Sequence, residues 1–407
     1  MKTVNWERQP LGAVADLCLG KMLDQNKNRG EPFPYLANVN VRWGEFALDD
    51  LRTMRFEPKE MDRYGLRFGD IVMCEGGEPG RCAIWRDQLP GMKIQKALHR
   101  IRPKELLDYR FLFYTLLHIG HSRGFDQYFT GATIKHLPGE KLAKVEVDFP
   151  PLPVQRRIAG ILSAYDELIE NTQRRIRILE AMARALYREW FVHFRFPGHE
   201  NHPRVSSPLG EIPEGWEVKG LGQVADVNRA QINARTAPRE LHYIDISSVS
   251  PGRIDSITTY ALADAPGRAR RIIQHGDVLW SCVRPNRRSH AQVMNPDPDT
   301  IASTGFAVLT PTKVPFTFLY CATTTDEFVD FLTNNATGSA YPAVTAATFE
   351  RSALLVPTSP LLEKFGDVTI STAEEIHTLQ RQIQNLRRTR DLLLPRLLSG
   401  HIEVEAA

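Results

Sequence analysis

The chain has 407 residues, enough for two domains that each bury a sizeable core, and its 42% hydrophobic and 24% charged residues are typical of a globular protein. A formal net charge of +3 excludes overall charge as the basis of nucleic-acid binding, so any such surface must be a local patch. No apolar run approaches the ~20 residues of a membrane span, and the first residues, MKTVNWERQP, lack the apolar core of a signal peptide. The five cysteines are scattered and form no C-x-x-C pair, which argues against a disulfide framework and a zinc knuckle. We therefore expect a cytoplasmic protein that neither contacts a membrane nor holds a metal.

In chain order, a domain of mixed pattern comes first and a long helix follows it. Short β-like runs such as DIVMC and CAIW alternate with turns rich in Gly, Pro and Asn, and residues 105–119 predict a helix within this domain. No proline occurs between Val154 and about Trp190, where charged and aliphatic residues alternate in blocks, so this stretch predicts the long helix. The same order then recurs, with a helix expected at 316–332 in the second mixed domain. The expected order is a mixed domain, a long helix, a linker, a second mixed domain, a second long helix and a tail, at 1–153, 154–195, 196–210, 211–360, 361–400 and 401–407.

An internal repeat explains this order. LGAVADLCLG (11–20) returns as LGQVADVNRA (221–230), FGDIVMC (68–74) as HGDVLWS (275–281), TGAT (130–133) as TGSA (337–340), and FPPLP (149–153) as VPTSP (356–360). The offset drifts only from 210 to 207 along the chain, although a single Gly-Asp match would mean nothing by itself. The chain is therefore two copies of one unit, and in each copy the prolines end a strand just before a helix begins.

The two long helices carry matching apolar stripes with a spacing close to a heptad repeat. Two such stripes in one chain are most economically buried against each other, and a helix of ~37 residues spans roughly 55 Å. We therefore expect an α+β protein whose two similar domains are separated by two long, antiparallel, coiled-coil-like helices, with an internal pseudo-twofold repeat. The stripe residues that we expect at the helix-pair or subunit interface are Ile158, Ile161, Tyr165, Ile169, Ile176, Leu179, Leu186, Phe365, Val368, Ile376, Ile383, Leu386 and Leu393.

The sequence contains no catalytic motif that would make the chain an enzyme. The loops G-x-G-x-x-G and G-x-x-x-x-G-K-[ST] are absent, as are H-E-x-x-H and G-x-S-x-G. Glu57-Pro58-Lys59 has only the outline of a nuclease motif, and His193, His199 and His202 occupy a stretch rich in Pro and Gly that does not organise a metal site. Two hypotheses remain: a non-catalytic coiled-coil protein adaptor, and a DNA reader whose two domains each recognise a few base pairs of an asymmetric, split site.

Several stretches identify a family. TGATIKHLPGEKLAKVEVDFPPLPVQRRI, LYREWFVHFRFPGHE, LGEIPEGWEV, ASTGFAV and LLLPRLLSGHIEV occur in this order. Together with the duplicated layout, they make nearly the whole chain resemble the specificity (S) subunits of type I restriction–modification systems. One departure is that the second proline element, SPLLEKF, lacks the glutamine that Gln155 supplies in the first.

The resemblance implies a specificity subunit without catalytic activity. Each mixed domain would be a target-recognition domain that reads one half of a bipartite DNA site, and the helices would set the unread spacer. The implied partners are double-stranded DNA, two adenine-N6 methyltransferase subunits and two restriction/translocase subunits. S-adenosylmethionine, ATP and Mg would be used by those partners, and this chain would bind no cofactor.

Candidate DNA contacts follow from the repeat and from side-chain chemistry. RPNRR (284–288) places three arginines and an asparagine just beyond the second Gly-Asp turn, and such side chains suit guanine, adenine or phosphate. Arg81 is the counterpart of Arg288 at an offset of 207, and several cations, Arg100 and Arg102 among them, follow it. The TGAT and TGSA turns bring small residues to the same place in each copy. The DNA-binding candidates are Arg81, Lys93, Lys96, Thr130, Lys135, His136, Arg284, Asn286, Arg287, Arg288, Ser339 and Tyr341.

Overall fold

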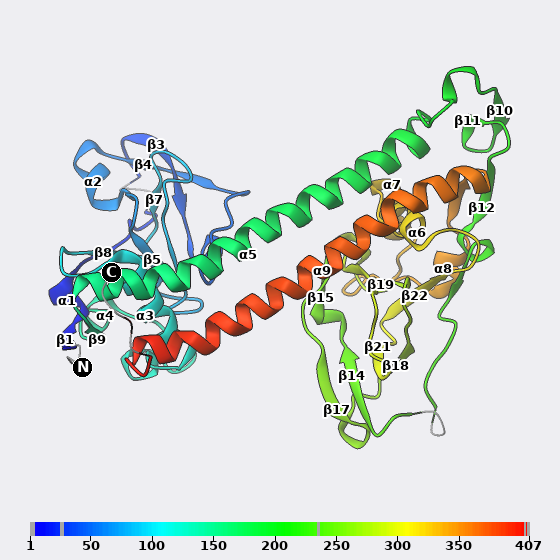
Figure 1. Ribbon diagram of the computed structural model, residues 1–407. Helices are drawn as coiled ribbons and strands as arrows, with labels where there is room; N and C mark the ends of the chain where they lie inside the picture. The colour runs from blue at the N-terminus through cyan, green and yellow to red at the C-terminus, as the bar shows by residue number, and fades with distance from the viewer. Residues whose placement is uncertain (1–4, 25–27, 234–236, 403, 405–407) are drawn as a thin grey trace. The chain divides into compact units, whose positions relative to one another are not determined.

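The computed structural model describes residues 5–24, 28–233, 237–402 and 404 (Figure 1). The chain forms two compact units, of which unit 1 combines Met1–Asn171 with Ile383–Ala407 and unit 2 is Thr172–Gln382. Two long helices, α5 (Leu152–Tyr187) and α9 (Ser359–Leu398), each contribute residues to both units. Residues 1–4 of the expected first domain and residues 403 and 405–407 of the expected tail lie outside the described part. Unit 1 is therefore built from both ends of the chain.

In the residues that the structure describes, unit 1 has three β-sheets and four short or medium α-helices besides its parts of α5 and α9. The four-stranded antiparallel sheet has the order β2-β8-β5-β6, a second sheet has the order β4-β3-β7, and β1 pairs with β9. The strands are β1 (Glu7–Pro10), β2 (Ala15–Leu19), β3 (Glu31–Leu36), β4 (Arg52–Phe56), β5 (Ile71–Cys74), β6 (Cys82–Ile84), β7 (Lys93–Ile94), β8 (Leu98–Pro103) and β9 (Glu146–Phe149). The helices are α1 (Leu11–Val14), α2 (Met61–Tyr64), α3 (Tyr109–His121) and α4 (Gly139–Leu142).

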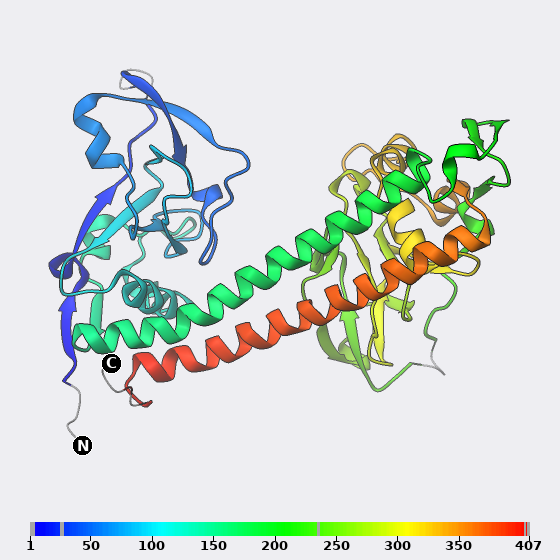
Figure 2. The ribbon, with the colours of Figure 1, turned by 45° about the horizontal axis from the view of Figure 1, so that its top comes forward.

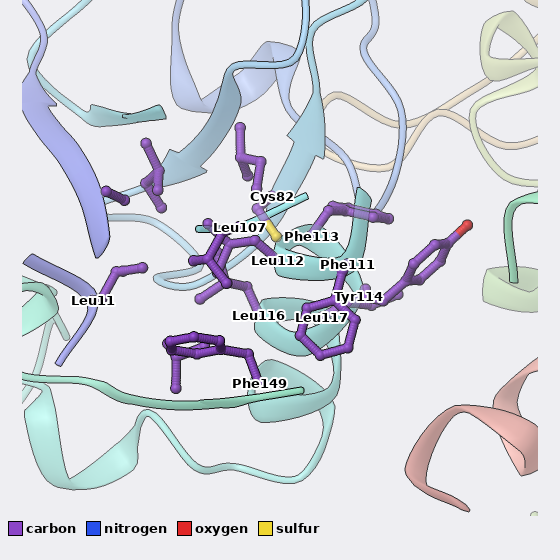
Figure 3. Packing of buried hydrophobic residues seen from close by; sticks show 14 of the residues in the cluster. Leu11, Cys82, Leu107, Phe111, Leu112, Phe113, Tyr114, Leu116, Leu117 and Phe149 are labelled. Carbon is purple, nitrogen blue, oxygen red and sulfur yellow. The ribbon is translucent and has the colours of Figure 1, made fainter. Parts of the chain in front are cut away.

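Helix α3 organises the main core of unit 1. It begins at Tyr109 because the carboxylate of Asp108 accepts hydrogen bonds from the backbone N–H groups of Arg110 (3.0 Å) and Phe111 (3.2 Å), which are otherwise unpaired at a helix start. The start therefore lies four residues after position 105, where the apolar pattern alone begins. The buried face of α3 packs against residues of other elements, including Leu11, Cys82 and Phe149 (Figure 3).

Unit 2 repeats these sheets with small additions. Its sheets have the orders β13-β22-β19-β20 and β17-β14-β21-β18, and β12 pairs with β23. The strands are β12 (Glu217–Gly220), β13 (Ala225–Val227), β14 (Glu240–Ile244), β15 (Val249–Ser250), β16 (Arg253–Ile254), β17 (Thr258–Ala261), β18 (Ala269–Ile272), β19 (Val278–Ser281), β20 (His290–Gln292), β21 (Thr300–Ser303), β22 (Phe306–Pro311) and β23 (Ala353–Val356). The helices are α6 (Phe316–Thr323), α7 (Asp326–Asn334) and α8 (Ala346–Glu350).

The repeat predicted from the sequence is visible in the strand pairing. Strand β5 lies between β8 and β6, and β19, 207 residues later, lies between β22 and β20. The parallel pair β3 and β7 corresponds to the parallel pair β14 and β21. In each copy a strand near the start pairs with the strand before the prolines, as β1 with β9 and β12 with β23. The predicted α+β fold with two similar domains is therefore confirmed.

Two intervals of unit 2 differ from their expected form. The helix expected at 316–332 is interrupted between α6 and α7, because the hydroxyl of Thr325 caps α7 by accepting a hydrogen bond from the N–H of Phe328 (3.2 Å). The interval 196–210, expected to be a linker, contains part of a β-hairpin formed by β10 (Arg204–Ser207) and β11 (Gly210–Pro213). Phe196 is buried there against Trp216, with ring centroids 5.3 Å apart. Helix α5 itself gives way to a π-helical turn at Arg188–Val192.

The proline junction of unit 1 is held by one buried side chain. The amide nitrogen of Gln155 donates hydrogen bonds to the carbonyls of Leu106 (2.9 Å) and Pro150 (2.8 Å), and its oxygen accepts one from the N–H of Asp108 (2.9 Å). Gln155 is only 1% exposed, so these bonds join the start of α5 to the start of α3 in a buried place. At the equivalent position of unit 2, Leu362 is buried in an apolar cluster instead.

Within each unit, segments of α5 and α9 lie side by side and run antiparallel (Figures 1 and 2). In unit 1, Ile158 and Leu162 belong to the same buried cluster as Leu394 and Leu397. Among the expected stripe residues, the buried ones are Ile158, Ile169, Ile176, Phe365 and Ile383, and the partly buried ones are Ile161, Tyr165, Leu179, Leu186, Ile376, Leu386 and Leu393.

The prediction of the apolar stripe was wrong for one residue, Val368. Val368 is 52% exposed, and the neighbouring Thr369 is buried in its place. A buried hydroxyl needs a partner, and Thr369 has two: the hydroxyl of Thr317 and the carbonyl of Phe365, both at 2.7 Å. Val368 therefore does not belong to the helix packing.

The two units differ most clearly at one place where α5 and α9 meet a third helix. In unit 1 a polar cluster forms there: the hydroxyl of Tyr114 on α3 donates to the carboxylate of Asp166 on α5 (2.6 Å), which also pairs with Arg390 on α9. The positions 207 residues away from these three are Cys321, Ala373 and Ala183. In unit 2 these small residues line a cavity of about 70 Å³.

Candidate nucleic-acid interface

In unit 2, two loops meet where strand β19 ends. Residues 282–288 follow β19, and residues 337–343 follow α7. The N–H of Val344 donates to the carbonyl of Cys282 (2.9 Å), and the N–H of Arg284 donates to the carbonyl of Pro342 (2.7 Å). An isolated bridge also pairs Val283 with Ala343. These backbone bonds bring together the two segments of unit 2 that contain the predicted DNA-binding residues.

The arginines of the first loop are held in different ways. Arg284 donates from its guanidinium to the carbonyl of Ala340 (3.0 Å) and lies over the ring of Tyr341, 4.6 Å from the centroid. Arg288 pairs with Asp326 at 2.5 Å. Both arginines have left-handed backbones, with φ of 52° and 54°. Such strain costs roughly 1–2 kcal/mol for a residue with a Cβ and is often found at functional sites.

The remaining candidates of unit 2 are accessible. Asn286 and Arg287 are exposed at the tip of the first loop, and Ser339 and Tyr341 are exposed on the second. His290, which follows the first loop in β20, is buried, and burial together with the nearby Arg288 lowers its pKa to about 4. Its ring is therefore neutral at physiological pH, and the positive charge of this surface comes from the arginines.

Unit 1 has the same pair of loops. Gly76 forms an isolated bridge with His136, as Val283 does with Ala343 in unit 2, and the N–H of Leu137 donates to the carbonyl of Glu75 (2.8 Å). The imidazole of His136 lies 3.1 Å from the carboxylate of Glu75. The equivalent loops thus use the same backbone pairing but different side chains.

Two predicted contacts in unit 1 face inward. The guanidinium of Arg81 donates to Glu78 (2.7 Å) and to the carbonyl of Asn38 (2.8 Å), so it fixes the turn that contains it. Lys93 is 5% exposed, its ammonium lies 5.0 Å from the ring centroid of Phe33, and burial lowers its pKa. The expectation that Lys93 contacts DNA was therefore wrong in this structure, because its charge is packed inside the domain.

Arg100 and Arg102 also have structural roles. Arg100 is buried and donates to three carbonyls, those of residues 62, 63 and 65. Arg102 forms two hydrogen bonds of 2.7 Å with the carboxylate of Asp70. Besides the partly exposed Arg81, whose guanidinium is bound within its turn, the candidates of unit 1 that are exposed or partly exposed are Lys96, Thr130, Lys135 and His136.

Sequence reasoning missed one prominent residue of this surface, Ile134. It is 66% exposed and lies 207 residues before Tyr341. The repeat offset would have identified it as the counterpart of Tyr341, but an isoleucine carries no charge or hydrogen-bonding group to attract attention.

Neither a metal site nor a membrane-spanning segment is present in the described part of the chain. No group of three or more His, Cys, Asp or Glu side chains is placed to hold a metal ion among the described residues. No helix of the described part combines the length and the apolar character that a bilayer crossing requires. The exposed loops of each unit present positively charged and small polar side chains, and each unit adds one exposed apolar side chain, Ile134 or Tyr341.

Comparison with known proteins finds likeness to type I specificity subunits. Residues 3–181 match the family model described as the type I restriction modification DNA specificity domain. This match covers nearly all of the expected first domain and most of helix α5. The MjaIX specificity subunit of Methanocaldococcus jannaschii is 25% identical over 92% of this chain and 88% of its own. The HindI specificity subunit of Haemophilus influenzae is 21% identical over 66% of this chain and 72% of its own.

A solved structure supports the fold. The crystal structure of a type I restriction–modification S subunit from M. genitalium superposes with a TM-score of 0.59 at 16% identity, covering 98% of this chain and 97% of that one. The curated relatives are named as specificity subunits rather than as catalytic subunits, in line with the missing catalytic motifs.

Proposed function

We propose that this chain is the sequence-specific DNA-binding subunit of a type I restriction–modification complex and reads an asymmetric, bipartite DNA site. The observation that carries the proposal is the loop pair that recurs in both units with the same backbone pairing, Gly76 with His136 and Val283 with Ala343. Because the side chains on the two loop pairs differ, the two half-sites differ in sequence. Exposed arginine and asparagine side chains in unit 2 are suited to bidentate contacts with guanine and adenine.

The long helices serve two purposes in this proposal. They separate the two recognition domains and so determine the number of unread base pairs, and they provide the surface on which two methyltransferase subunits dock. Two restriction/translocase subunits complete the assembly. The chain itself binds neither S-adenosylmethionine nor ATP nor Mg, which are used by the partners to methylate adenine N6, translocate DNA and cleave it.

The test is a genome-wide map of N6-methyladenine in cells that express this chain together with its candidate methyltransferase subunit. The expected result is a single split, asymmetric motif that disappears when this chain is omitted. If the two proteins co-purify but no motif appears, the recognition domains do not read DNA as proposed. If they fail to co-purify, the coiled-coil adaptor becomes the better hypothesis.

A double variant tests whether the first loop of unit 2 contacts DNA. Asn286→Ala with Arg287→Ala removes two exposed side chains, and losing one bidentate contact costs about 1–3 kcal/mol of discrimination. The half-site read by unit 2 should become relaxed or unrecognised, while the other half-site and the co-purification persist. Arg204→Ala, which removes an exposed arginine from strand β10, is the matched control and should leave the motif unchanged.

A further inference from the structure

The two most exposed large hydrophobic side chains of the described residues occupy the same position in the two copies. Ile134 is 66% exposed and Tyr341 is 69% exposed, and they are 207 residues apart, the offset of the surrounding repeat. A single exposed apolar side chain is ordinary on a protein surface and needs no explanation. Two at equivalent positions, in loops that otherwise share only their initial Thr-Gly, point to a shared purpose.

The backbone presents both side chains in the same way. The N–H and C=O groups of Thr130 and His136 pair with each other (2.8 and 2.9 Å) and enclose residues 131–135. Thr337 and Ala343 pair likewise, both bonds at 2.9 Å, and enclose residues 338–342. Each tip is therefore a short closed loop rather than a free end.

A glycine permits this loop shape in each copy. Gly131 has φ of 88° and Gly338 has φ of 101°, conformations that strain any residue with a Cβ. A Cβ on Gly131 would lie 2.2 Å from the carbonyl oxygen of Ile134, and one on Gly338 would lie 3.2 Å from that of Tyr341. The carbonyl of the tip residue thus folds over the glycine, and its side chain is left on the outside.

A positively charged side chain lies near the tip of each of the two closed loops. The guanidinium of Arg284 lies under the ring of Tyr341, and Lys135, adjacent to Ile134 in the chain, is exposed, with its ammonium 5.4 Å from the ring centroid of Phe129. An apolar tip beside a cation matches a DNA groove, where the cation meets phosphate and the apolar group meets base atoms.

The geometry points to Ile134 and Tyr341 as equivalent apolar probes, each of which contacts bases of its own half-site in a DNA groove and contributes to sequence discrimination. This inference rests on the proposed function and names two side chains that contribute to it. The shared chemistry is apolar contact with a base, supplied either by the methyl group of thymine or by the faces of a base step that the side chain enters. Ile and Tyr differ in shape, so the two probes discriminate differently.

The test compares Ile134→Ala and Tyr341→Ala in the full chain, bound to its methyltransferase subunit, on duplexes with and without the mapped motif. Each variant should bind the specific duplex about tenfold more weakly, the size of a mismatched base pair, with unchanged non-specific binding and salt dependence. Lys135→Ala should instead weaken both duplexes and lower the salt slope by about one. Leu209→Ala, which removes an exposed apolar side chain elsewhere, should change nothing.

Two duplex modifications distinguish the sources of the apolar contact. Replacing thymine by uracil removes the methyl group, and 2-aminopurine reports unstacking at an entered base step. A wild-type signal from either one that the Ala variant lacks supports the inference. If neither Ala variant changes discrimination, or if both lose the methyltransferase subunit instead, the probes do not contact bases. A wild type that yields no split motif would defeat the proposed function itself, a different outcome.

Discussion

Replacing Gln155 by leucine tests whether one buried amide holds the first junction between domain and helix. The substitution keeps the approximate volume and copies Leu362, its counterpart in unit 2. It removes three hydrogen bonds of 2.8 to 2.9 Å to backbone groups. A buried polar group left without a partner costs about 1–3 kcal/mol, and the two groups that are only partly buried can regain water, so we expect a loss of about 2–4 kcal/mol.

The assay is urea unfolding of the full chain, read together with hydrogen exchange over α3 and the first turns of α5. The midpoint should fall with little change in the m-value, and exchange should rise at the starts of both helices. Gln384→Leu, at an exposed site on α9, is the control and should stay within about 0.5 kcal/mol of wild type. The reciprocal Leu362→Gln should also destabilise, because it buries an amide in an apolar cluster. A Gln155→Leu protein as stable as the control would refute this account of the junction.

Other predictions concern pairs of equivalent positions. Asp70→Asn should cost about 2–3 kcal/mol at neutral pH in urea unfolding, because it leaves the partly buried guanidinium of Arg102 without its carboxylate, and a change below 0.5 kcal/mol would contradict this. Burial raises the pKa of Asp277, so the folded state holds that proton more tightly than the unfolded chain, and wild-type stability falls as the pH rises from about 4 through the raised pKa. The advantage of wild type over Asp277→Asn should therefore shrink as the pH rises above about 4, the ordinary pKa of an aspartate, and a constant difference would count against the argument. Tyr114→Phe should cost about 1 kcal/mol by removing one bond of the polar cluster of unit 1. Cys321→Tyr should instead be tolerated, because the cavity of unit 2 accepts the larger ring, and destabilisation by more than 2 kcal/mol would show that it does not.

The repeat made much of the fold predictable. A nearly constant offset assigns strands, turns and helices of one copy to the other without knowledge of either, and the prolines indicate where each long helix begins. The sequence did not predict the places where a single hydroxyl group interrupts a helix or an apolar stripe. Thr325 ends one helix pattern and begins another, and Thr369 replaces Val368 in the helix packing because its hydroxyl finds two buried partners. Apolar periodicity does not detect a satisfied polar group.

The candidate surface was predictable at the level of loops and less so at the level of side chains. The RPNRR and TGSA segments were expected to belong to the surface of one domain, and the backbone brings them together. Arg81 and Lys93 turned inward because a carbonyl, a carboxylate and an aromatic ring lay within their reach. A sequence shows which residues are charged, but whether a charge faces solvent depends on neighbours contributed by distant segments.

The composition of unit 1 has a consequence for how the chain is made. Its main core includes Leu394 and Leu397, which are synthesised after the last residue of unit 2. Unit 2 is one continuous stretch and can fold as soon as it leaves the ribosome, whereas the earlier segment must wait with the apolar face of Ile158 and Leu162 uncovered. The core of unit 1 can therefore be completed only after the whole of unit 2 has been synthesised. A chain truncated after Gln382 would therefore contain all of unit 2 but would lack part of the core of unit 1, although most of unit 1 is synthesised first.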